Sequence, residues 1–479
     1  MACIVSIVKD QDIKDYPKYP PFDPDIGYPE YPFSQALGEE ENRIYHMVRL
    51  ALWQMGWDAA NYGTANWSPL SEIVKPGDIV VIKPNLVTFS EANFKSTITH
   101  GAVIRPIIDY VYIALKRNKG KIIVAEVPAQ NMPLRSFNKA VHCTGLARIV
   151  SCLRERGVPI ELRNCSSERR YFSGFSSKLH IERFSGDPLG NFLVDLGELS
   201  EFCGLNEMQY GYGCSYLLRE EKSHFSNRKH EYSIPRTFLD ANVIINMPKI
   251  KTHNIAGISG ALKNVLGITD KRYWIPHWRI NEISSQQQGL RFLLFKLRNF
   301  QLLGSCNQYL YKISYNIRNV EWIINRMIKK LLRIKVSERP LIEGIDWRKN
   351  DILWRVIIDL NRILFYSTKE GKISPYRQRK YLTVADGIIG GQGNNPLSAE
   401  PKVLSTICAS IDPVALDIVV CDMLGLDYKK VKSVTRAERL SIFPIGSGDI
   451  DDIVIRRLDV HKLSGNKDVE SNQAIKKKK

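Results

Sequence analysis

The chain is short of the features that mark membrane-spanning and secreted proteins. No apolar stretch approaches the ~20 residues that a transmembrane helix needs. The first ten residues, Met1 to Asp10, carry no basic leader and too few apolar residues for the core of a signal peptide. Their pattern instead favours a first β-strand. We therefore expect a cytoplasmic protein without a transmembrane segment.

Closely spaced cysteines are absent as well. Nine cysteines are scattered over 479 residues, and no two of them form a Cys-x-x-Cys pair. An odd number of scattered thiols in an intracellular chain indicates free cysteines. Zinc ribbons and ferredoxin-type clusters need thiolates a few residues apart. We therefore expect neither a structural zinc nor an iron–sulphur cluster.

Acidic residues are outnumbered by basic ones, and the imbalance is local. The net charge is +18, and half of that excess comes from residues 289–335, where ten basic residues accompany one acid, Glu321. Apolar residues alternate with the basic ones, which predicts a basic amphipathic helical insertion over 275–340. Two interpretations stay open: these helices lie on an anionic membrane surface, or they pack on the core with the basic face in solvent. The basic end of the chain, 466–479, is expected to be disordered. Since no recognised nucleic-acid module accompanies the charge, we expect no specific nucleic-acid partner.

An alternation of strands and helices fills most of the remaining sequence. The composition, 44% hydrophobic and 25% charged, is that of a globular protein. Apolar strands are predicted over 79–82, 121–125, 158–162 and 242–246, and helices over 41–57, 104–117, 145–156 and 350–362. Continuous apolar strands separated by helices are typical of a parallel sheet covered on both faces. We predict an α/β fold with a mostly parallel sheet and helices on both faces, whose core combines residues 1–274 with 341–465.

Two segments interrupt this alternation. The run over 16–32 is rich in tyrosine, and it contains too many prolines for a helix or a central strand. We interpret this run as a surface excursion, with a lid over a site as the alternative. Residues 165–232 are polar and mixed, and we interpret them as a second excursion with weak β character.

Polar side chains follow three of the predicted strands at the point where each strand ends. They are Lys83 and Asn85 after the first, Glu126 after the second, and Asn246, Lys249, Lys251 and His253 after the third. In an open parallel sheet, ligands bind outside the carboxyl ends of the strands. Lysines bind phosphates and carboxylates as point charges. We therefore predict that these side chains meet at one edge of the sheet and bind an anion.

A glycine turn over 257–260 leads into a short predicted helix that carries Lys263 and Asn264. A helix N-terminus after such a turn presents free N–H groups that favour an anion, so both residues join the candidates. His253 titrates near neutrality, which leaves the roles of general base, metal ligand and plain loop residue open. His100, which precedes another helix, is a further candidate.

Acidic candidates lie in the last third of the chain. Asp386 ends a strand before a predicted glycine-rich loop over 387–396, whose glycines permit close approach of a ligand. Asp412 stands before Pro413, where it is either the N-cap of a helix or a substrate-binding residue. Asp359 and Asn361 lie near the end of a predicted helix, and either reach the site or hold neighbouring loops.

These motifs together resemble domain-of-unknown-function family 362. The matching stretches are Ile82-Lys83-Pro84-Asn85-Leu86, Thr99-His100, Ile245-Asn246-Met247-Pro248-Lys249-Ile250-Lys251-Thr252-His253, Leu262-Lys263-Asn264-Val265-Leu266-Gly267, Asp386-Gly387-Ile388 and Ser410-Ile411-Asp412-Pro413-Val414-Ala415-Leu416-Asp417. The resemblance covers about half of the chain and implies no reaction, because the biochemistry of the family is largely unassigned. Some relatives carry iron–sulphur cysteine motifs, which this chain lacks. The stretch Asp359-Leu360-Asn361-Arg362 resembles a subtype found among polysaccharide-assembly proteins.

We expect an enzyme that acts on an anionic small molecule, a sugar phosphate or a hydroxy acid, by proton-transfer chemistry of the isomerase or epimerase type. The expected catalytic residues are His253, Lys263 and Asp386. The expected substrate-binding residues are Lys83, Asn85, His100, Asn246, Lys249, Lys251, Asn264 and Asp412. A divalent metal held by Asp386 or Asp412 is an option. The alternatives are a non-catalytic anion-binding protein and a scaffold at the inner face of a membrane.

Overall fold

The computed structural model describes residues 3–172, 179–205, 212–213, 223–226, 228–279, 346–393, 397, 399–447 and 450–460. The basic insertion predicted over 275–340, except for its first five residues, lies outside these ranges, as does the tail over 466–479. Among the described helices, none is long and apolar enough to cross a membrane.

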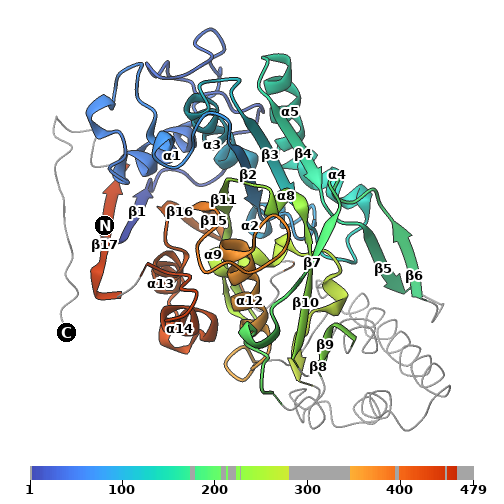
Figure 1. Ribbon diagram of the computed structural model, residues 1–479. Coiled ribbons are helices and arrows are strands. Elements are labelled where there is room, and N and C mark those ends of the chain that lie inside the picture. The colour runs from blue at the N-terminus through green and yellow to red at the C-terminus, as the bar shows by residue number, and fades with distance from the viewer. Residues whose placement is uncertain are drawn as a thin grey trace, which may run out of the picture.

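A ten-stranded sheet forms the centre of the molecule (Figure 1). Its main order is β17 (Ile453–Asp459), β1 (Cys3–Lys9), β16 (Glu400–Ser410), β15 (Lys380–Gln392), β11 (Val243–Met247), β2 (Ile79–Pro84), β3 (Lys121–Glu126) and β4 (Ile160–Asn164). Two further strands, β12 (Lys249–His253) and β13 (Gly257–Ser259), extend it beside β15. Along the main order only β16 is antiparallel to its neighbours. The mostly parallel α/β fold is therefore confirmed.

Helices cover both faces of this sheet. One face packs against α1 (Arg43–Gln54), α3 (Gly101–Ala114) and α5 (Leu146–Glu155), and the other against α9 (Ala261–Asn264), α12 (Leu353–Tyr366), α13 (Pro413–Met423) and α14 (Lys432–Glu438). Side chains alternate between the two cores, as strand geometry requires. In β2, Val80 and Ile82 join the core of the first face, whereas Val81 joins that of the second.

The remaining elements are short. The helices are α2 (Phe94–Thr97), α4 (Leu134–Cys143) and α8 (Arg236–Leu239); the strands are β5 (Glu168–Phe172) with β6 (Leu179–Arg183), β7 (Asn191–Asp195) with β10 (Lys229–Pro235) and β9 (Phe225–Ser226), and β8 (Tyr212–Gly213) with β14 (Trp278–Arg279). The described parts of the second excursion therefore contain β-strands, in agreement with its weak β character.

Two predicted loops are strands. Residues 249–253 form β12, and the glycine-rich stretch up to Gln392 continues β15. Glycine makes this possible, because a Cβ at Gly391 would lie 2.7 Å from the Cβ of Lys251, and one at Gly387 would lie 2.9 Å from Ile250 Cδ1. The glycines admit a neighbouring strand, not a ligand, and the loop prediction for Gly387 to Gln392 is wrong.

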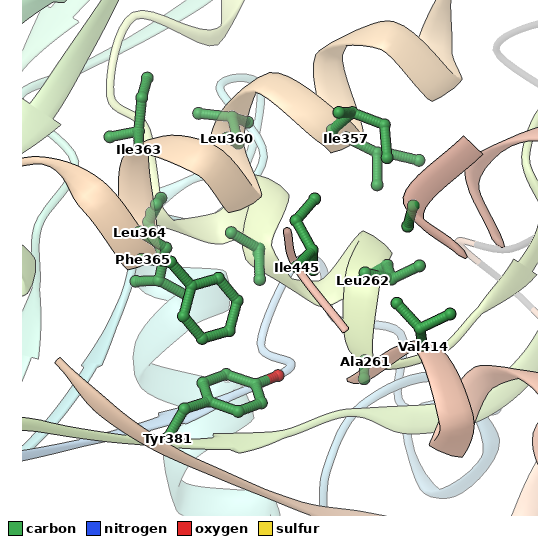
Figure 2. Close-up of a cluster of buried hydrophobic side chains, with 14 of the residues drawn as sticks. Ala261, Leu262, Ile357, Leu360, Ile363, Leu364, Phe365, Tyr381, Val414 and Ile445 are labelled. Carbon is green, nitrogen blue, oxygen red and sulfur yellow. The ribbon is translucent and has the colours of Figure 1, made fainter. Parts of the chain in front are cut away.

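The short helix α9 is fixed by apolar packing. Figure 2 shows Ala261 and Leu262 of α9 in one buried cluster with Ile357 and Leu360 of α12 and with Val414 of α13. Since Lys263 is the third residue of α9, this packing determines where its side chain begins.

Candidate functional site

The strand ends predicted to converge lie side by side in the sheet. Lys83 at the end of β2 is in register with Asn246 of β11. Lys249 of β12 is in register with Asp386 of β15. Glu126 ends β3, the other neighbour of β2. Parallel pairing therefore brings residues from distant parts of the sequence to one edge.

A fully buried network surrounds Asp386. Its Oδ1 accepts a hydrogen bond from the Tyr16 hydroxyl (2.7 Å), and its Oδ2 accepts from Lys249 Nζ (2.9 Å) and from the His100 backbone N–H (3.0 Å). Lys249 Nζ also contacts the Tyr16 hydroxyl. The His100 ring stacks on the Tyr16 ring, with centroids 4.0 Å apart. The site candidates Asp386, Lys249 and His100 thus bind one another and Tyr16.

Burial dominates the electrostatics of this network. It lowers the pKa of Lys249 and lowers the pKa of His100 well below its usual value. It raises the pKa of Tyr16 well above its usual value, and the neighbouring Asp386 charge adds to that. Tyr16 comes from the proline-rich run, which we interpreted as a surface excursion; in the structure this run buries Tyr16 and Phe22.

A second buried pair lies at the ends of β2 and β3. Lys83 Nζ is 3.0 Å from Glu126 Oε2 and also donates to the Pro84 carbonyl. The guanidinium of Arg272 lies 3.7 Å from Glu126 Oε1. A Cβ at Gly267 would overlap both Glu126 and Lys83, so any larger residue there would displace this pair. Lys83 is therefore held in place, with its charge largely balanced.

Six basic groups form what we call the cation cluster: Lys83, Lys251, His253, Lys263, Arg272 and His277. Their charges act on one another. After burial, the charge of Lys263 is the largest cause that lowers the pKa of Lys251 and of His253. After burial, Arg272 and then Lys83 lower the pKa of Lys263. Glu126 is the carboxylate that pairs with Lys83 and Arg272, and burial favours the neutral forms of the other members of the cluster.

Lys263 occupies a special position within the cation cluster. Burial and the neighbouring cations lower its pKa from 10.5 to about 7. Its side chain is partly exposed, whereas Lys83, Lys249 and Lys251 are buried. Within the described part of the chain, no hydrogen bond or ion pair engages its amine. At neutral pH this amine is therefore present in both charged and neutral forms.

The two histidines of the cation cluster are held in defined neutral forms. His253 Nδ1 accepts hydrogen bonds from the backbone N–H groups of Ile255 (3.1 Å) and Ala256 (3.2 Å). Because Nδ1 accepts, the ring proton resides on Nε2, and burial lowers the pKa of His253 well below its usual value. His277 Nδ1 lies 2.8 Å from the Ile275 carbonyl, and burial lowers the pKa of His277 to about 4. His253 is therefore a hydrogen-bond donor at neutral pH.

The predicted asparagines support the strand ends. Asn264 Nδ2 donates to Asn246 Oδ1 (2.7 Å) and more weakly to the Lys83 carbonyl (3.4 Å). Asn246 Nδ2 donates in turn to the Ala261 carbonyl and the Tyr381 hydroxyl. Asn85 Oδ1 accepts from the Val87 backbone N–H at 3.3 Å. The structure thus brings Asn246 and Asn264 together beneath Lys83.

The N-terminus of α9 does not present free N–H groups to a ligand. The buried carboxylate of Asp417 accepts from the backbone N–H groups of Ala261 and Leu262 (3.0 Å for Leu262). Burial raises the pKa of Asp417 to about 7. The expectation of an anion at this helix end is wrong, because a carboxylate of the chain already occupies it.

The other acidic candidates also serve the fold. Asp412 Oδ1 caps α13 by accepting from the Val414 and Ala415 N–H groups, and its Oδ2 accepts from Ser447. Asp359 accepts from the Ser200 and Tyr232 hydroxyls and so holds neighbouring segments. Among the described residues, no three histidines, cysteines or acids group closely enough to hold a metal ion.

Three participants escaped the sequence analysis. Arg272 and His277 follow α9 in a stretch without a recognisable motif, and Tyr16 lies in a proline-rich run far from the other residues in sequence. The signal for Arg272 and His277 was their basic character shortly after Lys263. No sequence signal distinguishes Tyr16 from the other tyrosines of its run.

Comparisons with known proteins identify the family of the chain. A crystal structure of a Thermotoga maritima protein aligns with 80% of this chain and 59% of its own, at 10% identity and a TM-score of 0.29, which is too low to indicate a shared fold or function. A thylakoid-associated protein of Synechocystis is 36% identical over 63 residues, 13% of this chain. The match spans 20% of that relative's length. The model of the family described as Domain of unknown function (DUF362) matches residues 80–422, from β2 to the last turn of α13, and the chain therefore belongs to that family.

Proposed function

We propose that the chain is an enzyme that binds an anionic small molecule, of the class of sugar phosphates and hydroxy acids, at the cation cluster and moves a proton on it. The observation that carries this proposal is that Lys251, Lys263 and Arg272 are brought close enough together for the charge of each to act on a neighbour's pKa. Burying several cations together costs stability unless an anion compensates them. A phosphate or carboxylate supplies that compensation.

Different members of the cation cluster suit different tasks. Lys251 and Arg272 supply charge for the anion. His253 Nε2–H donates a hydrogen bond to an oxygen of the substrate. Lys263 exchanges a proton, because a group whose pKa lies near the working pH serves best as acid and base. From the sequence, His253 is a candidate for the general base. In this proposal Lys263 has that role.

The proposal extends to the location of the enzyme in the cell and to the process it serves. We place it in the cytoplasm, and the resemblance of residues 359–362 supports a link to surface-polysaccharide assembly. The second candidate function is a non-catalytic anion-binding protein or a scaffold at a membrane surface. The partial likeness to a thylakoid-associated protein supports the membrane variant, in which residues 289–335 would contact anionic lipid.

Calorimetric titration with inorganic phosphate tests the binding step. We expect the wild type to bind phosphate at pH 6.5 and to lose affinity as the pH rises through the pKa of Lys263. Lys251→Ala should weaken binding about tenfold, which is roughly 1.4 kcal/mol. The control Lys430→Ala, at an exposed lysine between α13 and α14, should bind like the wild type. Absence of phosphate binding, or equal binding by Lys251→Ala, contradicts the proposal.

Proton exchange separates the enzyme from the non-catalytic alternative. In D2O, ¹H NMR follows the loss of carbon-bound protons from lactate, glucose 6-phosphate and fructose 6-phosphate. The enzyme should exchange a proton of at least one of them, and Lys263→Ala should abolish that exchange. Phosphate binding without any exchange favours the binding protein.

A further inference from the structure

We infer that Lys263 is a covalent nucleophile, which condenses with the carbonyl group of an anionic carbonyl compound of the 2-oxo acid class to form an imine. This inference rests on the anion binding proposed above, requires a carbonyl in the ligand, and gives Lys263 a covalent role in place of the acid–base role. It assigns covalent chemistry to the cation cluster, whereas anion binding alone needs only charged groups.

The first argument is the state of the amine. A lysine amine attacks a carbonyl only when it is neutral, and an ordinary lysine is neutral in roughly one molecule in a few thousand at pH 7. Lys263, with its pKa lowered to about 7, is neutral in about half of the molecules. Desolvation and adjacent cations, here Arg272 and Lys83, are the two means by which proteins prepare a nucleophilic lysine.

The second argument is geometric and concerns all four lysines near the strand ends. Lys83 is paired with Glu126, Lys249 is paired with Asp386, and Lys251 donates to the Thr97 carbonyl. All three are at most 2% exposed. Lys263 alone among the four is partly exposed, and its amine has no hydrogen-bond or ion-pair partner in the described part of the chain. The other three lysines are held in ion pairs and hydrogen bonds, whereas the amine of Lys263 is available to react with a carbonyl.

The third argument is what surrounds that amine. The charges of Lys251 and Arg272 suit the carboxylate of a 2-oxo acid. The Nε2–H of His253, fixed by the two backbone hydrogen bonds to Nδ1, suits the oxygen of the carbonyl. A donor on that oxygen polarises the carbonyl and makes its carbon more electrophilic.

The step balances without a further reactant. The lone pair of Lys263 Nζ forms a bond to the carbonyl carbon, and the carbonyl π electrons move to the oxygen. The two protons of the amine transfer to that oxygen, which leaves as water, so one imine and one water form. The imine then withdraws electrons from the neighbouring carbon, which is the effect that proton transfer on the ligand needs.

Reductive trapping tests this inference on the full chain. The protein is incubated with pyruvate at pH 7, reduced with sodium borohydride, digested and mapped by mass spectrometry. We expect one main adduct, on the peptide that contains Lys263. Lys263→Arg keeps a positive charge but not a nucleophilic amine, so it should retain pyruvate binding in calorimetry and lose the adduct. The control Lys430→Ala should give the wild-type adduct.

The outcomes separate the two proposals. Pyruvate binding by the wild type without an adduct at Lys263, or an equal adduct in Lys263→Arg, overturns the covalent role and leaves the proposed anion binding in place. If the wild type binds neither phosphate nor pyruvate, the proposed function itself is overturned. A circular dichroism spectrum of Lys263→Arg that matches the wild type shows that the loss of adduct is not a loss of fold.

Discussion

At the scale of single residues, Lys263 costs the folded state stability. In the unfolded chain its pKa is about 10.5, and in the fold it is about 7. Between these values the unfolded chain binds more protons, so the free energy of unfolding rises with pH over this window. Below pH 7 the penalty is present in full. A site that strains its surroundings in this way is typical of function.

Lys263→Met should therefore stabilise the protein at pH 7, by an amount on the order of a few kcal/mol, because it removes the buried charge. The gain should shrink as the pH rises from 7 toward 10.5, because the amine is then neutral in the folded state and begins to lose its proton in the unfolded chain as well. Urea denaturation at pH 7 and pH 10 measures both values.

The control for this prediction is Lys430→Met, at a side chain that is 67% exposed. It should change the free energy of unfolding by less than about 0.5 kcal/mol at either pH. If Lys263→Met is no more stable than the wild type at pH 7, or if its gain is independent of pH, Lys263 does not carry a depressed pKa.

Residue chemistry was also the part of the site that the sequence predicted best. Lys83 does lie near the end of β2, because a strand end can be recognised where an apolar run stops. Lys251 and His253 lie on β12, and Lys263 lies on α9. What the sequence does not show is the charge state. Burial and the nearby charges of Lys263 and Lys251 lower the pKa of His253 and keep its ring neutral, and both depend on three-dimensional geometry. The backbone N–H groups of Ile255 and Ala256 then fix the tautomer of that ring.

At the scale of elements, the four-residue helix α9 depends on a contact far away in sequence. A helix of this length is not stable by itself. Its N-terminal N–H groups are satisfied by Asp417 of α13, and its apolar side chains pack against α12. The sequence predicts the helix, but the glycine turn predicted over 257–260 is wrong for residues 257–259, which form β13. The sequence also does not predict that Asp417 binds the N–H groups of α9. Asp417 lies 156 residues from Ala261, so no local pattern reveals the pair.

Gly260→Ala should disrupt the hydrogen bonds between Asp417 and the N-terminus of α9. A Cβ at Gly260 would overlap the Asp417 carboxylate, so either the carboxylate or the turn must move. We expect a loss of ~2 kcal/mol or more in the free energy of unfolding, in line with overpacking of a buried site. We also expect a weaker pyruvate adduct at Lys263. Urea denaturation and the trapping assay measure the two effects.

Gly27→Ala is the matched control, because its added Cβ meets only Leu37 at 3.8 Å. It should leave both measurements near their wild-type values. Equal stability of Gly260→Ala and the wild type would mean that α9 does not need the Asp417 contact.

At the scale of the whole molecule, the sheet joins segments that are far apart in the chain. β1 from the start of the chain lies between β16 and β17 from its end, and β15 pairs with β11. The alternation of apolar strands and helices predicted the α/β class, but strand order follows from tertiary contacts. For that reason the sequence did not predict that β15 and β12 would extend through glycine-rich and lysine-rich stretches taken for loops.

The family match begins at residue 80, yet the preceding segment is part of the same molecule. Tyr16 reaches the buried network that Lys249 and Asp386 form at the edge of the sheet. Its hydroxyl donates to Asp386 and lies against Lys249, and the Ile389 backbone N–H donates to it at 3.3 Å. The N-terminal segment therefore stabilises the strand ends that carry the site.

Tyr16→Phe tests this dependence with the loss of one oxygen atom. The change leaves Asp386 and Lys249 buried with one partner fewer, and a buried polar group without its partner costs ~1–3 kcal/mol. We expect the free energy of unfolding to fall by that amount in urea denaturation at pH 7. Tyr19→Phe, in the same proline-rich run but 74% exposed, should be indistinguishable from the wild type. Equal stability of the two variants would show that the N-terminal segment lies over the core without supporting the site, and the family-matched region would then suffice to hold Lys249 and Asp386.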